Sequence, residues 1–320
     1  MRDVHVTYST SDGPVPAVRG VDLSVAAGEV VGVAGESGCG KSTLASTVLR
    51  LYPKSAEVNG EVLLDGEDVL SMSWGRLRAA RWGEAAVVFQ GSLHSLNPIQ
   101  RIGRQLAEPI LLHDKSANPK SAASKVKDLL GQVGLPARHA DAYPHQLSGG
   151  QKQRVMIALA LSCDPRVLIA DEPTTALDVM VQAQILDLLT GIAQVRSMAV
   201  LVISHDLSVL ATICDRVAVM YAGRIIEHGP AREVFETPEH PYTRALTGAF
   251  PTIGDRTSRY APSGLPGDPP FPGDLPSGCP FHPRCPSAQP VCPTVDVKLL
   301  PAGPDRAAAC VLVNQEVTAG

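Results

Sequence analysis

The sequence has no apolar run that approaches the roughly 18 to 20 residues of a membrane-spanning helix; its longest apolar stretches lie near residues 155–163 and 198–203. The chain is therefore not expected to cross a bilayer by itself. It also has no excess of basic residues, because 28 Lys and Arg face 32 Asp and Glu, for a net charge of −4. This balance gives no indication of the positive surface that nucleic acid requires.

The first ten residues, MRDVHVTYST, lack the charged and then apolar segments of a secretion signal, so we expect a cytosolic protein. The sequence also lacks internal repeats and sustained heptads. What it does have is a hydrophobic content of 44% over 320 residues. This is enough for one large domain with an appendage or for two ordinary domains.

A phosphate-binding loop is predicted directly after the apolar stretch VVGVA at residues 30–34. The residues that follow match G-x-x-x-x-G-K-[ST] at every position, and its glycines let successive backbone N–H groups point at an anion. The residues expected to contact nucleotide phosphates are Gly35, Ser37, Gly38, Cys39, Gly40, Lys41, Ser42 and Thr43. Lys41 would reach the β- and γ-phosphates, and Ser42 would ligate Mg²⁺. The alternative is a Gly-rich turn that matches by chance.

Polar side chains follow three predicted buried strands, at the point where each strand ends. The strands span residues 85–89, 167–170 and 199–203. The polar residues that follow them are Gln90, Asp171, Glu172 and His205. Because the carboxyl ends of parallel strands meet at one edge of a sheet, we expect these residues to gather with Lys41 around one nucleoside triphosphate.

Each of these polar residues suits one catalytic role. Asp171 suits Mg²⁺ coordination, because hard cations prefer oxygen, and Glu172 suits the polarisation of an attacking water. Gln90 can join the metal to that water, and His205 can hydrogen-bond the γ-phosphate as charge develops on its oxygens. Taken singly, the carboxylates would be a helix cap, the glutamine a loop residue and the histidine a surface side chain. Their order along the chain favours the catalytic interpretation.

Two further segments are candidates for nucleotide contact. Ser148, Gly149, Gly150 and Gln151 open a predicted helix, and a hydroxyl with two glycines at that position makes a second anion site. Tyr8 ends a predicted strand shortly before the phosphate loop and could stack on adenine. An ordinary half-buried strand tyrosine would give the same pattern.

The remaining pattern predicts an α/β fold with an antiparallel β subdomain and a helical insert. Alternating apolar residues at 4–8 and 21–25, on either side of the turn-rich residues 9–16, indicate the antiparallel sheet. Helical periodicity at residues 102–112 and 122–133 indicates the insert.

The phosphate loop GESGCGKST, the motif LSGGQ, the strand VLIADEP and the loop TTALD together resemble the ATP-binding subunits of ABC transporters. The resemblance implies a P-loop NTPase core of ABC type, with a mixed sheet and helices, over residues 1–250. It places a helical subdomain at about residues 91–160 and leaves residues 251–320 as a short C-terminal region. The implied cofactors are ATP and Mg²⁺.

The same resemblance implies that two such domains pair head to tail. Each ATP would then lie between Lys41 of one domain and the Ser148-Gly149-Gly150 turn of the other. Asp178, the last residue of TTALD, is expected to belong to the same nucleotide site. A monomer should be inactive.

Three weaker motifs, SLNPIQRIGRQLAEP, HPYTRAL and CPFHPRCP, resemble the oligopeptide/dipeptide importer subfamily, which also contains nickel importers. The implied function is ATP hydrolysis that powers peptide import, by a subunit peripheral to the cytoplasmic face of the cell membrane. The implied partners are two membrane permease subunits, a second ATPase subunit (a sibling chain in preference to a second copy) and, indirectly, an extracytoplasmic substrate-binding protein. Import of nickel or another small solute is the alternative.

Other protein classes that use the same phosphate-binding loop fit this sequence less well. Chromosome-maintenance ATPases of the ABC type carry a long coiled coil between the phosphate loop and LSGGQ, and ribosome-acting members carry two cassettes, whereas this chain has neither. A regulatory nucleotide binder would lack Glu172 or His205, and small-molecule kinases lack LSGGQ. No nucleic-acid partner is expected.

The end of the chain is rich in proline and cysteine. Eleven prolines between residues 262 and 293 disfavour regular helices and central strands there. Cys279, Cys285, Cys292 and Cys310 could together bind Zn²⁺ or a [4Fe–4S] cluster. The spacing lacks paired C-x₂-C knuckles, which favours the cluster, and members of the resembled subfamily with such a tail carry one. The alternative is four reduced cysteines in a floppy tail.

Overall fold

The computed structural model describes residues 1–320 except 90, 92–94, 176, 249–264, 266 and 314–320. By its internal contacts the chain divides into two compact units. Unit 1 contains Met1–Ser24, Val31–Leu70 and Ile203–Gly320, and unit 2 contains Val25–Val30 and Ser71–Val202. The predicted boundary at residue 250 falls outside the described residues. Within the described ranges, no helix combines the length and the apolar character needed to cross a membrane.

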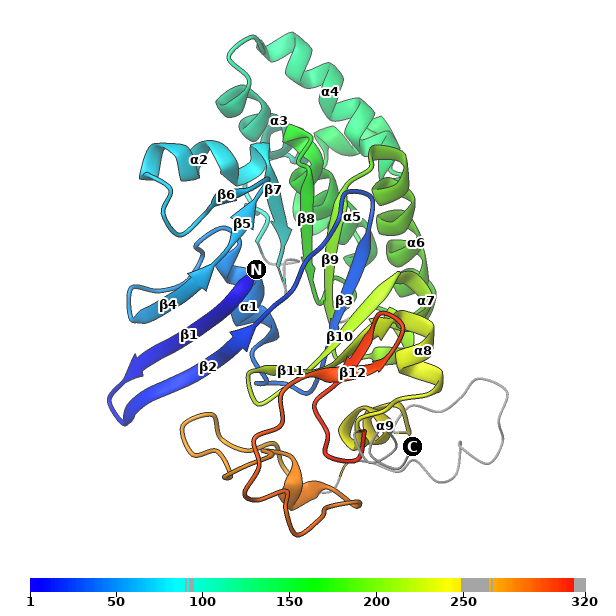
Figure 1. Cartoon of the computed structure of the whole chain (residues 1–320). Coiled ribbons are helices and arrows are strands. Elements are labelled where there is room, and N and C mark those ends of the chain that lie inside the picture. The colour runs from blue at the N-terminus through cyan, green and yellow to red at the C-terminus, as the bar shows by residue number, and fades with distance from the viewer. Residues whose placement is uncertain (90, 92–94, 176, 249–264, 266, 314–320) are drawn as a thin grey trace. The chain divides into compact units, whose positions relative to one another are not determined.

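Unit 1 begins with a three-stranded antiparallel sheet in the order β2-β1-β4 (Figure 1). The strands are β1 (Arg2–Thr10), β2 (Gly13–Val21) and β4 (Ala56–Glu61). The prediction that residues 9–16 form a turn-rich insertion is wrong, because Thr10 pairs with Gly13 and the turn occupies residues 11 and 12 alone. Pro14 and Pro16 are tolerated in β2 since it is the edge strand of this sheet, where a missing N–H breaks no interior ladder.

A second group of strands in unit 1 has the order β12-β13-β11-β10-β3. Its members are β3 (Val30–Ala34), β10 (Arg216–Tyr221), β11 (Arg224–Pro230), β12 (Leu300–Gly303) and β13 (Arg306–Ala308). β3 and β10 are parallel, and β10 and β11 form an antiparallel hairpin. β13 pairs with β11, so the C-terminal region adds strands to this sheet.

The helices described in unit 1 are short. They are α1 (Lys41–Thr47), α7 (Leu207–Ile213), α8 (Ala231–Glu236), α9 (Pro241–Gly248) and the 3₁₀ turn η5 (His282–Arg284), and a small hairpin joins β5 (Leu63–Leu64) to β6 (Glu67–Asp68). α1 contains only seven residues and begins at Lys41 of the phosphate loop. α7 and α9 are not among the predicted helices.

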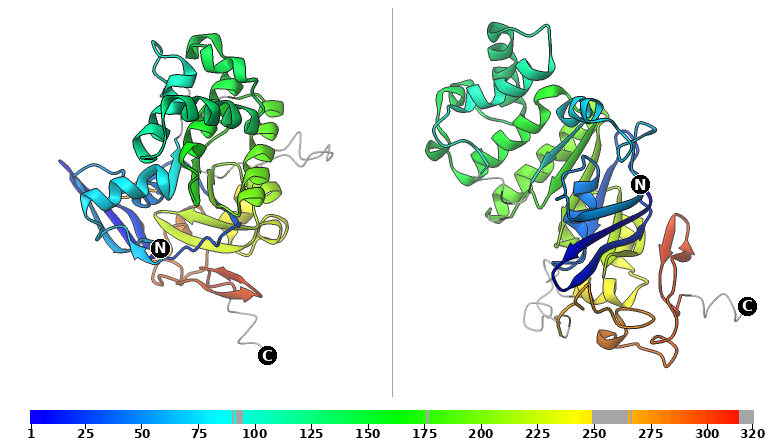
Figure 2. Two further views of the ribbon diagram at one scale, coloured as in Figure 1. Left: turned by 90° about the horizontal axis from the view of Figure 1, so that it is seen from above. Right: turned by 90° about the vertical axis from the view of Figure 1, so that its left-hand side faces the viewer.

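Unit 2 combines three strands in the order β9-β8-β7 with the longer helices. The strands are β7 (Ala85–Val88), β8 (Val167–Asp171) and β9 (Ala199–Ser204). The helices are α2 (Trp74–Gly83), α3 (Ile102–His113), α4 (Pro119–Gln132), α5 (Gly149–Ala160) and α6 (Val179–Arg196), with 3₁₀ turns η2 (Ala137–Asp141), η3 (Pro144–Gln146) and η4 (Leu161–Cys163). α3, α4 and α5 pack against one another, as the green and cyan ribbons of Figure 2 show from two sides.

An ion pair in the interior of unit 1 holds the C-terminal strands in place. Arg306 of β13 donates to the carboxylate of Glu227 on β11 at 3.1 Å, and the two side chains are 7% and 1% exposed. The same carboxylate accepts hydrogen bonds from the backbone N–H groups of Glu239 and His240, both at 2.9 Å. Arg306 also donates to the carbonyl of Thr237 at 2.6 Å. One buried carboxylate thus joins β11, β13 and the segment before α9.

We expect Arg306→Ala to lower the free energy of unfolding by about 3–5 kcal/mol, because it leaves the buried Glu227 carboxylate without its counter-charge. Chemical denaturation of the full chain measures the loss. Arg232→Ala is the matched control, since it removes an exposed ion pair with Glu236 on α8 and should leave the midpoint nearly unchanged. Equal losses in the two variants would contradict the assignment.

Candidate functional site

The predicted site residues are distributed over both units. Unit 1 holds Tyr8, the loop at residues 35–43 and His205, whereas unit 2 holds the Ser148–Gln151 segment, Asp171, Glu172 and Asp178. Gln90 lies outside the described residues.

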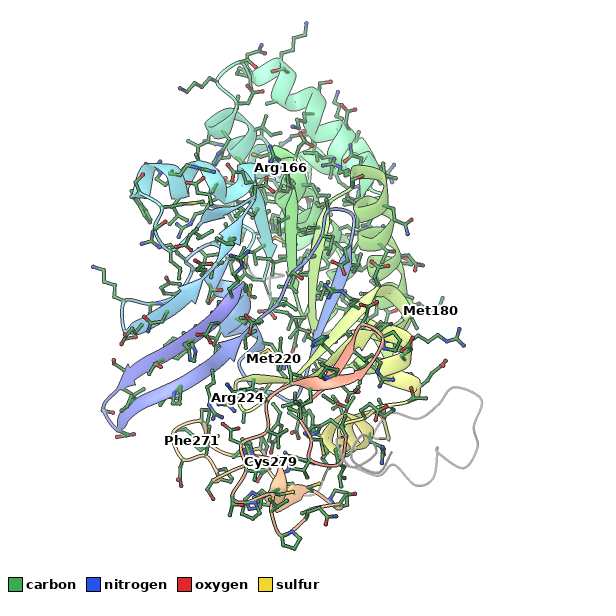
Figure 3. The ribbon with its side chains drawn as sticks, viewed as in Figure 1. Arg166, Met180, Met220, Arg224, Phe271 and Cys279 are labelled. Carbon is green, nitrogen blue, oxygen red and sulfur yellow. The ribbon has the colours of Figure 1, made fainter. Side chains whose placement is uncertain are left out.

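The 35–43 loop follows β3, whose five residues are all buried. Its shape depends on glycine at two positions. Gly35 has a φ of +150°, and a Cβ there would lie 2.4 Å from the carbonyl oxygen of Met220, a β10 residue labelled in Figure 3. Gly40 has a φ of +105°, and its Cβ would lie 2.3 Å from the carbonyl oxygen of Ala17 on β2. Any side chain would force the backbone away from these two carbonyls.

Lys41 is the cationic residue of this loop and is buried, with 5% of its surface exposed. Its Nζ donates to the carbonyls of Gly35 and Glu36 at 2.7 and 2.8 Å and lies 3.7 Å from Cys39 Sγ. These described partners are neutral. A buried ammonium with neutral partners keeps most of its charge available to an anion.

The residues around the loop differ in exposure and in their hydrogen bonds. The hydroxyl of Tyr8 donates to Thr43 Oγ1 at 3.3 Å, so the predicted adenine-stacking residue and the predicted phosphate donor lie side by side. Ser37, Gly38 and Ser42 are exposed. Cys39 is buried, and burial raises the pKa of its thiol, which is therefore protonated at neutral pH.

In unit 2 the LSGGQ segment caps its own helix. The Ser148 hydroxyl accepts from the Gln151 N–H at 3.3 Å, and the Gln151 side chain accepts from the Ser148 N–H at 3.0 Å. A Cβ at Gly150 would lie 2.6 Å from Val181 Cγ1. Val181 is on the first turn of α6, where its N–H donates to the Asp178 carboxylate at 3.0 Å. The glycine turn of α5 is thus packed against the start of α6.

The two carboxylates at the end of β8 differ in environment. Asp171 is 6% exposed, whereas Glu172 is half-buried and accepts from the Thr175 hydroxyl at 2.9 Å. Glu172 has a φ of +45°, in the left-handed region that non-glycine residues rarely adopt. Residues held in this strained backbone region concentrate at functional sites. His205 is exposed, and the next residue, Asp206, caps α7.

The four tail cysteines lie around one small cavity in unit 1, with a volume of about 20 Å³. None is in a disulfide. Burial raises the pKa of the thiols of Cys279, Cys285 and Cys310. The donor set fits a thiolate-binding metal, but within the described part of the chain no group of three or more His, Cys, Asp or Glu side chains is arranged to hold a metal ion.

Two residues that contact the 35–43 loop, Tyr242 and Arg284, were not predicted from the sequence. Tyr242, from the HPY motif, accepts from the Glu36 N–H at 2.9 Å, and Arg284 donates to the Glu36 carboxylate at 2.8 and 3.0 Å. Both residues lie in motifs that indicate the importer subfamily, HPYTRAL and CPFHPRCP, but neither motif by itself indicates a contact with the phosphate loop.

Two family descriptions match this sequence. "ABC transporter" matches residues 18–175, and "Oligopeptide/dipeptide transporter, C-terminal region" matches residues 226–292. The oligopeptide transport ATP-binding protein OppD of Escherichia coli is 43% identical over 294 residues, which cover 91% of this chain and 86% of that protein. OppD of Mycobacterium tuberculosis is 43% identical over 312 residues, which cover 97% of this chain and 51% of that protein.

Solved structures give the same fold. A dimeric bacterial ABC transporter cassette has a TM-score of 0.63 and 29% identity, covering 72% of this chain and 97% of that one. A structure of the same cassette in a post-hydrolysis state, bound to ADP and Pi, has a TM-score of 0.63 and 28% identity over the same shares. The α/β prediction, with its antiparallel part, is confirmed.

We expect Gly150→Ala to destabilise the chain by about 1–3 kcal/mol, because the added methyl group collides with the stiff side chain of Val181. The loss should shrink when Val181→Ala is added. Gly191→Ala on the exposed face of α6 is the control, and we expect it to increase stability. Nothing lies within 4 Å of the Cβ position there, and alanine favours a helix over glycine. Thermal unfolding of the four proteins tests this, and a Gly150→Ala loss that Val181→Ala does not reduce would contradict it.

Proposed function

Since the chain belongs to the ATP-binding subunits of ABC transporters, with the C-terminal region of the oligopeptide/dipeptide branch, we propose that the residues described above bind and hydrolyse ATP to power peptide import. The observation that carries this proposal is Lys41. A buried ammonium is held by neutral groups at the end of a loop whose path needs glycine, in a chain 43% identical to an OppD over 91% of its length. That arrangement suits the terminal phosphates of ATP.

The proposed division of labour follows the chemistry of each side chain. The 35–43 backbone and Lys41 hold the phosphates, and Tyr8 faces the adenine. Glu172, whose backbone is in the left-handed region, accepts the proton of the attacking water. His205 donates a hydrogen bond to the γ-phosphate, and Gln90 orients the water.

Asp171 and Ser42 are the residues that would hold Mg²⁺, with Gln90. Their oxygen donors suit a hard cation, and the burial of Asp171 limits competition from water for its carboxylate. The ion supplies neutralisation of the negative charge on the β- and γ-phosphate oxygens.

We expect Glu172→Gln to lower steady-state ATP turnover by about 10²- to 10⁴-fold while ATP binding is kept. Glutamine has the same shape and still accepts from the Thr175 hydroxyl, so the fold should not change. Turnover by the assembled transporter and ATP titration of the same protein provide the two readouts.

Lys41→Ala is the control for the binding site, because it should weaken ATP binding itself. A Glu172→Gln variant that hydrolyses ATP within about threefold of the unmodified protein would refute the role of the glutamate. Unchanged ATP affinity in Lys41→Ala would refute the phosphate loop.

The proposed assembly contains a second ATPase subunit, a sibling chain or a second copy, which places the Ser148-Gly149-Gly150 turn against the ATP of this chain. The side chains of Ser148 and Gln151 each accept a hydrogen bond from the backbone N–H of the other residue, so contacts within this chain already fix the turn. Two permease subunits at the cytoplasmic face of the membrane and an extracytoplasmic binding protein complete it. Nickel or another small solute remains the alternative cargo.

Unit 2 has a cavity of about 880 Å³ that suits the cytoplasmic helices of the permeases. It is lined from α2 by Trp74 and Arg78 and from α3 by Glu108 and Leu112, and Trp74 and Leu112 are 62% and 69% exposed. Large exposed apolar side chains beside charged ones are typical of a protein interface. Affinity purification of the tagged chain from membranes should therefore recover two integral membrane proteins.

We also propose that the four tail cysteines bind a [4Fe–4S] cluster, with Zn²⁺ as the alternative. This proposal is supported by two observations: the four cysteines line one cavity, and none of them forms a disulfide. Protein purified without oxygen should be brown, absorb broadly near 400 nm and contain about four irons per chain. Colourless protein with about one zinc per chain would favour zinc, and metal-free protein with four reactive thiols would refute both.

A further inference from the structure

Glu36, the second residue of the 35–43 loop, is held through all three of its polar groups. Its N–H donates to the Tyr242 hydroxyl at 2.9 Å, and its carbonyl accepts from Lys41 Nζ at 2.8 Å. Its carboxylate receives two parallel hydrogen bonds from the Arg284 guanidinium, at 2.8 and 3.0 Å. Arg284 lies 248 positions further along the chain, between Cys279 and Cys285, so the cysteine-rich tail touches the phosphate loop directly.

Arg284 is fixed independently of Glu36. Its side chain is 8% exposed, donates to the Gly267 carbonyl at 2.9 Å, and lies 6.0 Å from the centre of the Tyr221 ring. The bidentate bond to Glu36 raises the pKa of Arg284 above its usual value. The guanidinium is therefore always charged and has one available orientation.

A buried aromatic cluster joins this arginine to the loop. Tyr221, Tyr242 and the tail residue Phe281 have ring centres 4.6 to 5.4 Å apart, and none is more than 2% exposed. Tyr242 is fixed in turn by His240, whose Nδ1 accepts from the Tyr242 N–H at 3.0 Å. Burial lowers the pKa of His240 to about 3, which keeps that nitrogen free to accept. The tail, the HPY motif and the loop form one packed group.

The charge of Glu36 explains why the loop would need such a contact. A carboxylate beside a triphosphate site repels the ligand, and the repulsion is strong where little water screens it. A bidentate guanidinium cancels the charge and also fixes the backbone that must point its N–H groups at the phosphates. Arg284 fulfils both requirements from outside the loop.

We infer that Arg284 is a positioning residue of the ATP site: it neutralises Glu36 and so makes ATP affinity depend on the fold of the cysteine-rich tail. The inference rests on the proposed ATP binding by the 35–43 loop.

The test is ATP affinity of the full chain, measured by equilibrium titration. Arg284→Gln should weaken ATP binding roughly tenfold, because it leaves the Glu36 charge beside the phosphates. Adding Glu36→Gln removes that charge and should restore most of the affinity. Arg284→Lys, which keeps the charge but not the paired hydrogen bonds, should lie between Arg284→Gln and the unmodified chain.

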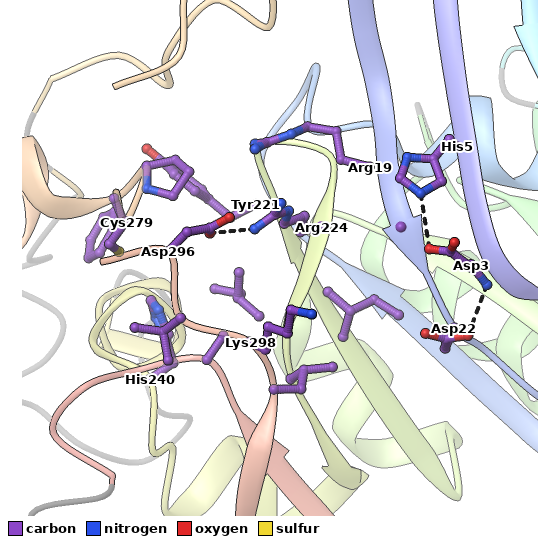
Figure 4. A pocket seen from close by; sticks show the side chains of 18 residues that line it. Asp3, His5, Arg19, Asp22, Tyr221, Arg224, His240, Cys279, Asp296 and Lys298 are labelled. Carbon is purple, nitrogen blue, oxygen red and sulfur yellow. Dashed lines mark hydrogen bonds and ion pairs between the residues drawn. The ribbon is translucent and has the colours of Figure 1, made fainter. Parts of the chain in front are cut away.

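The control breaks a different ion pair of the tail. Arg224 on β11 is paired with Asp296 at the rim of a cavity of about 460 Å³ (Figure 4), without contact to the 35–43 loop among its described interactions. Arg224→Gln should therefore leave ATP affinity unchanged. If it weakens ATP binding as much as Arg284→Gln does, the effect belongs to the tail as a whole and the inference is wrong.

Three other results decide the question. If Arg284→Gln binds ATP as tightly as the unmodified chain, the inference is wrong. If Lys41→Ala loses ATP binding in the same experiment, the proposed function still stands. An Arg284→Gln defect that Glu36→Gln does not relieve assigns Arg284 a structural role only and also overturns it. Unmodified ATP binding by Lys41→Ala overturns the proposed function and the inference together.

Discussion

The 35–43 loop is confined between two backbone carbonyls, and the described geometry of unit 1 depends on that confinement. Met220 on β10 and Ala17 on β2 leave no room for a side chain at Gly35 and Gly40. The antiparallel sheet and the strands around β3 therefore meet the loop from two sides. With its path fixed in this way, the loop presents Lys41 to its interior, where backbone oxygens orient the ammonium without neutralising it.

Elements whose signals lie within their own residues could be predicted from the sequence. α5 is the clearest case, because Ser148 and Gln151 supply both halves of a capping box inside the motif that announces the helix. β3 and β8 are continuous apolar runs, as strands buried on both faces must be. β12 and β13 could not be predicted, since β13 pairs with β11, more than 75 positions away, and β12 pairs with β13. Pro301 in β12 also argues locally against a strand.

The site residues likewise fall into those that could be predicted from local sequence and those that could not. The phosphate loop and Tyr8 could be proposed from local pattern and strand order, and in the structure Tyr8 contacts Thr43 of that loop. The start of α7 has a sequence signal, because Asp206 is a typical N-cap residue. The helix was nevertheless not predicted, since the segment was interpreted only through the adjacent His205. Glu36 occupies a position that the phosphate-loop pattern leaves variable, so nothing local distinguishes it. Its partner Arg284 becomes visible only when the tail is folded.

The order of the tail has a source that does not require metal. Arg306 and Glu227 form a buried pair, Phe281 packs between Tyr221 and Tyr242, and Arg284 completes the contact to the loop. Small metal domains, by contrast, fold only when the ion is bound. A metal held by the tail cysteines would have to displace protons from thiols whose pKa burial has raised, so its affinity should increase with pH. Arg284 lies next to Cys285, so the tail segment that would hold such a metal also carries the residue that contacts the phosphate loop.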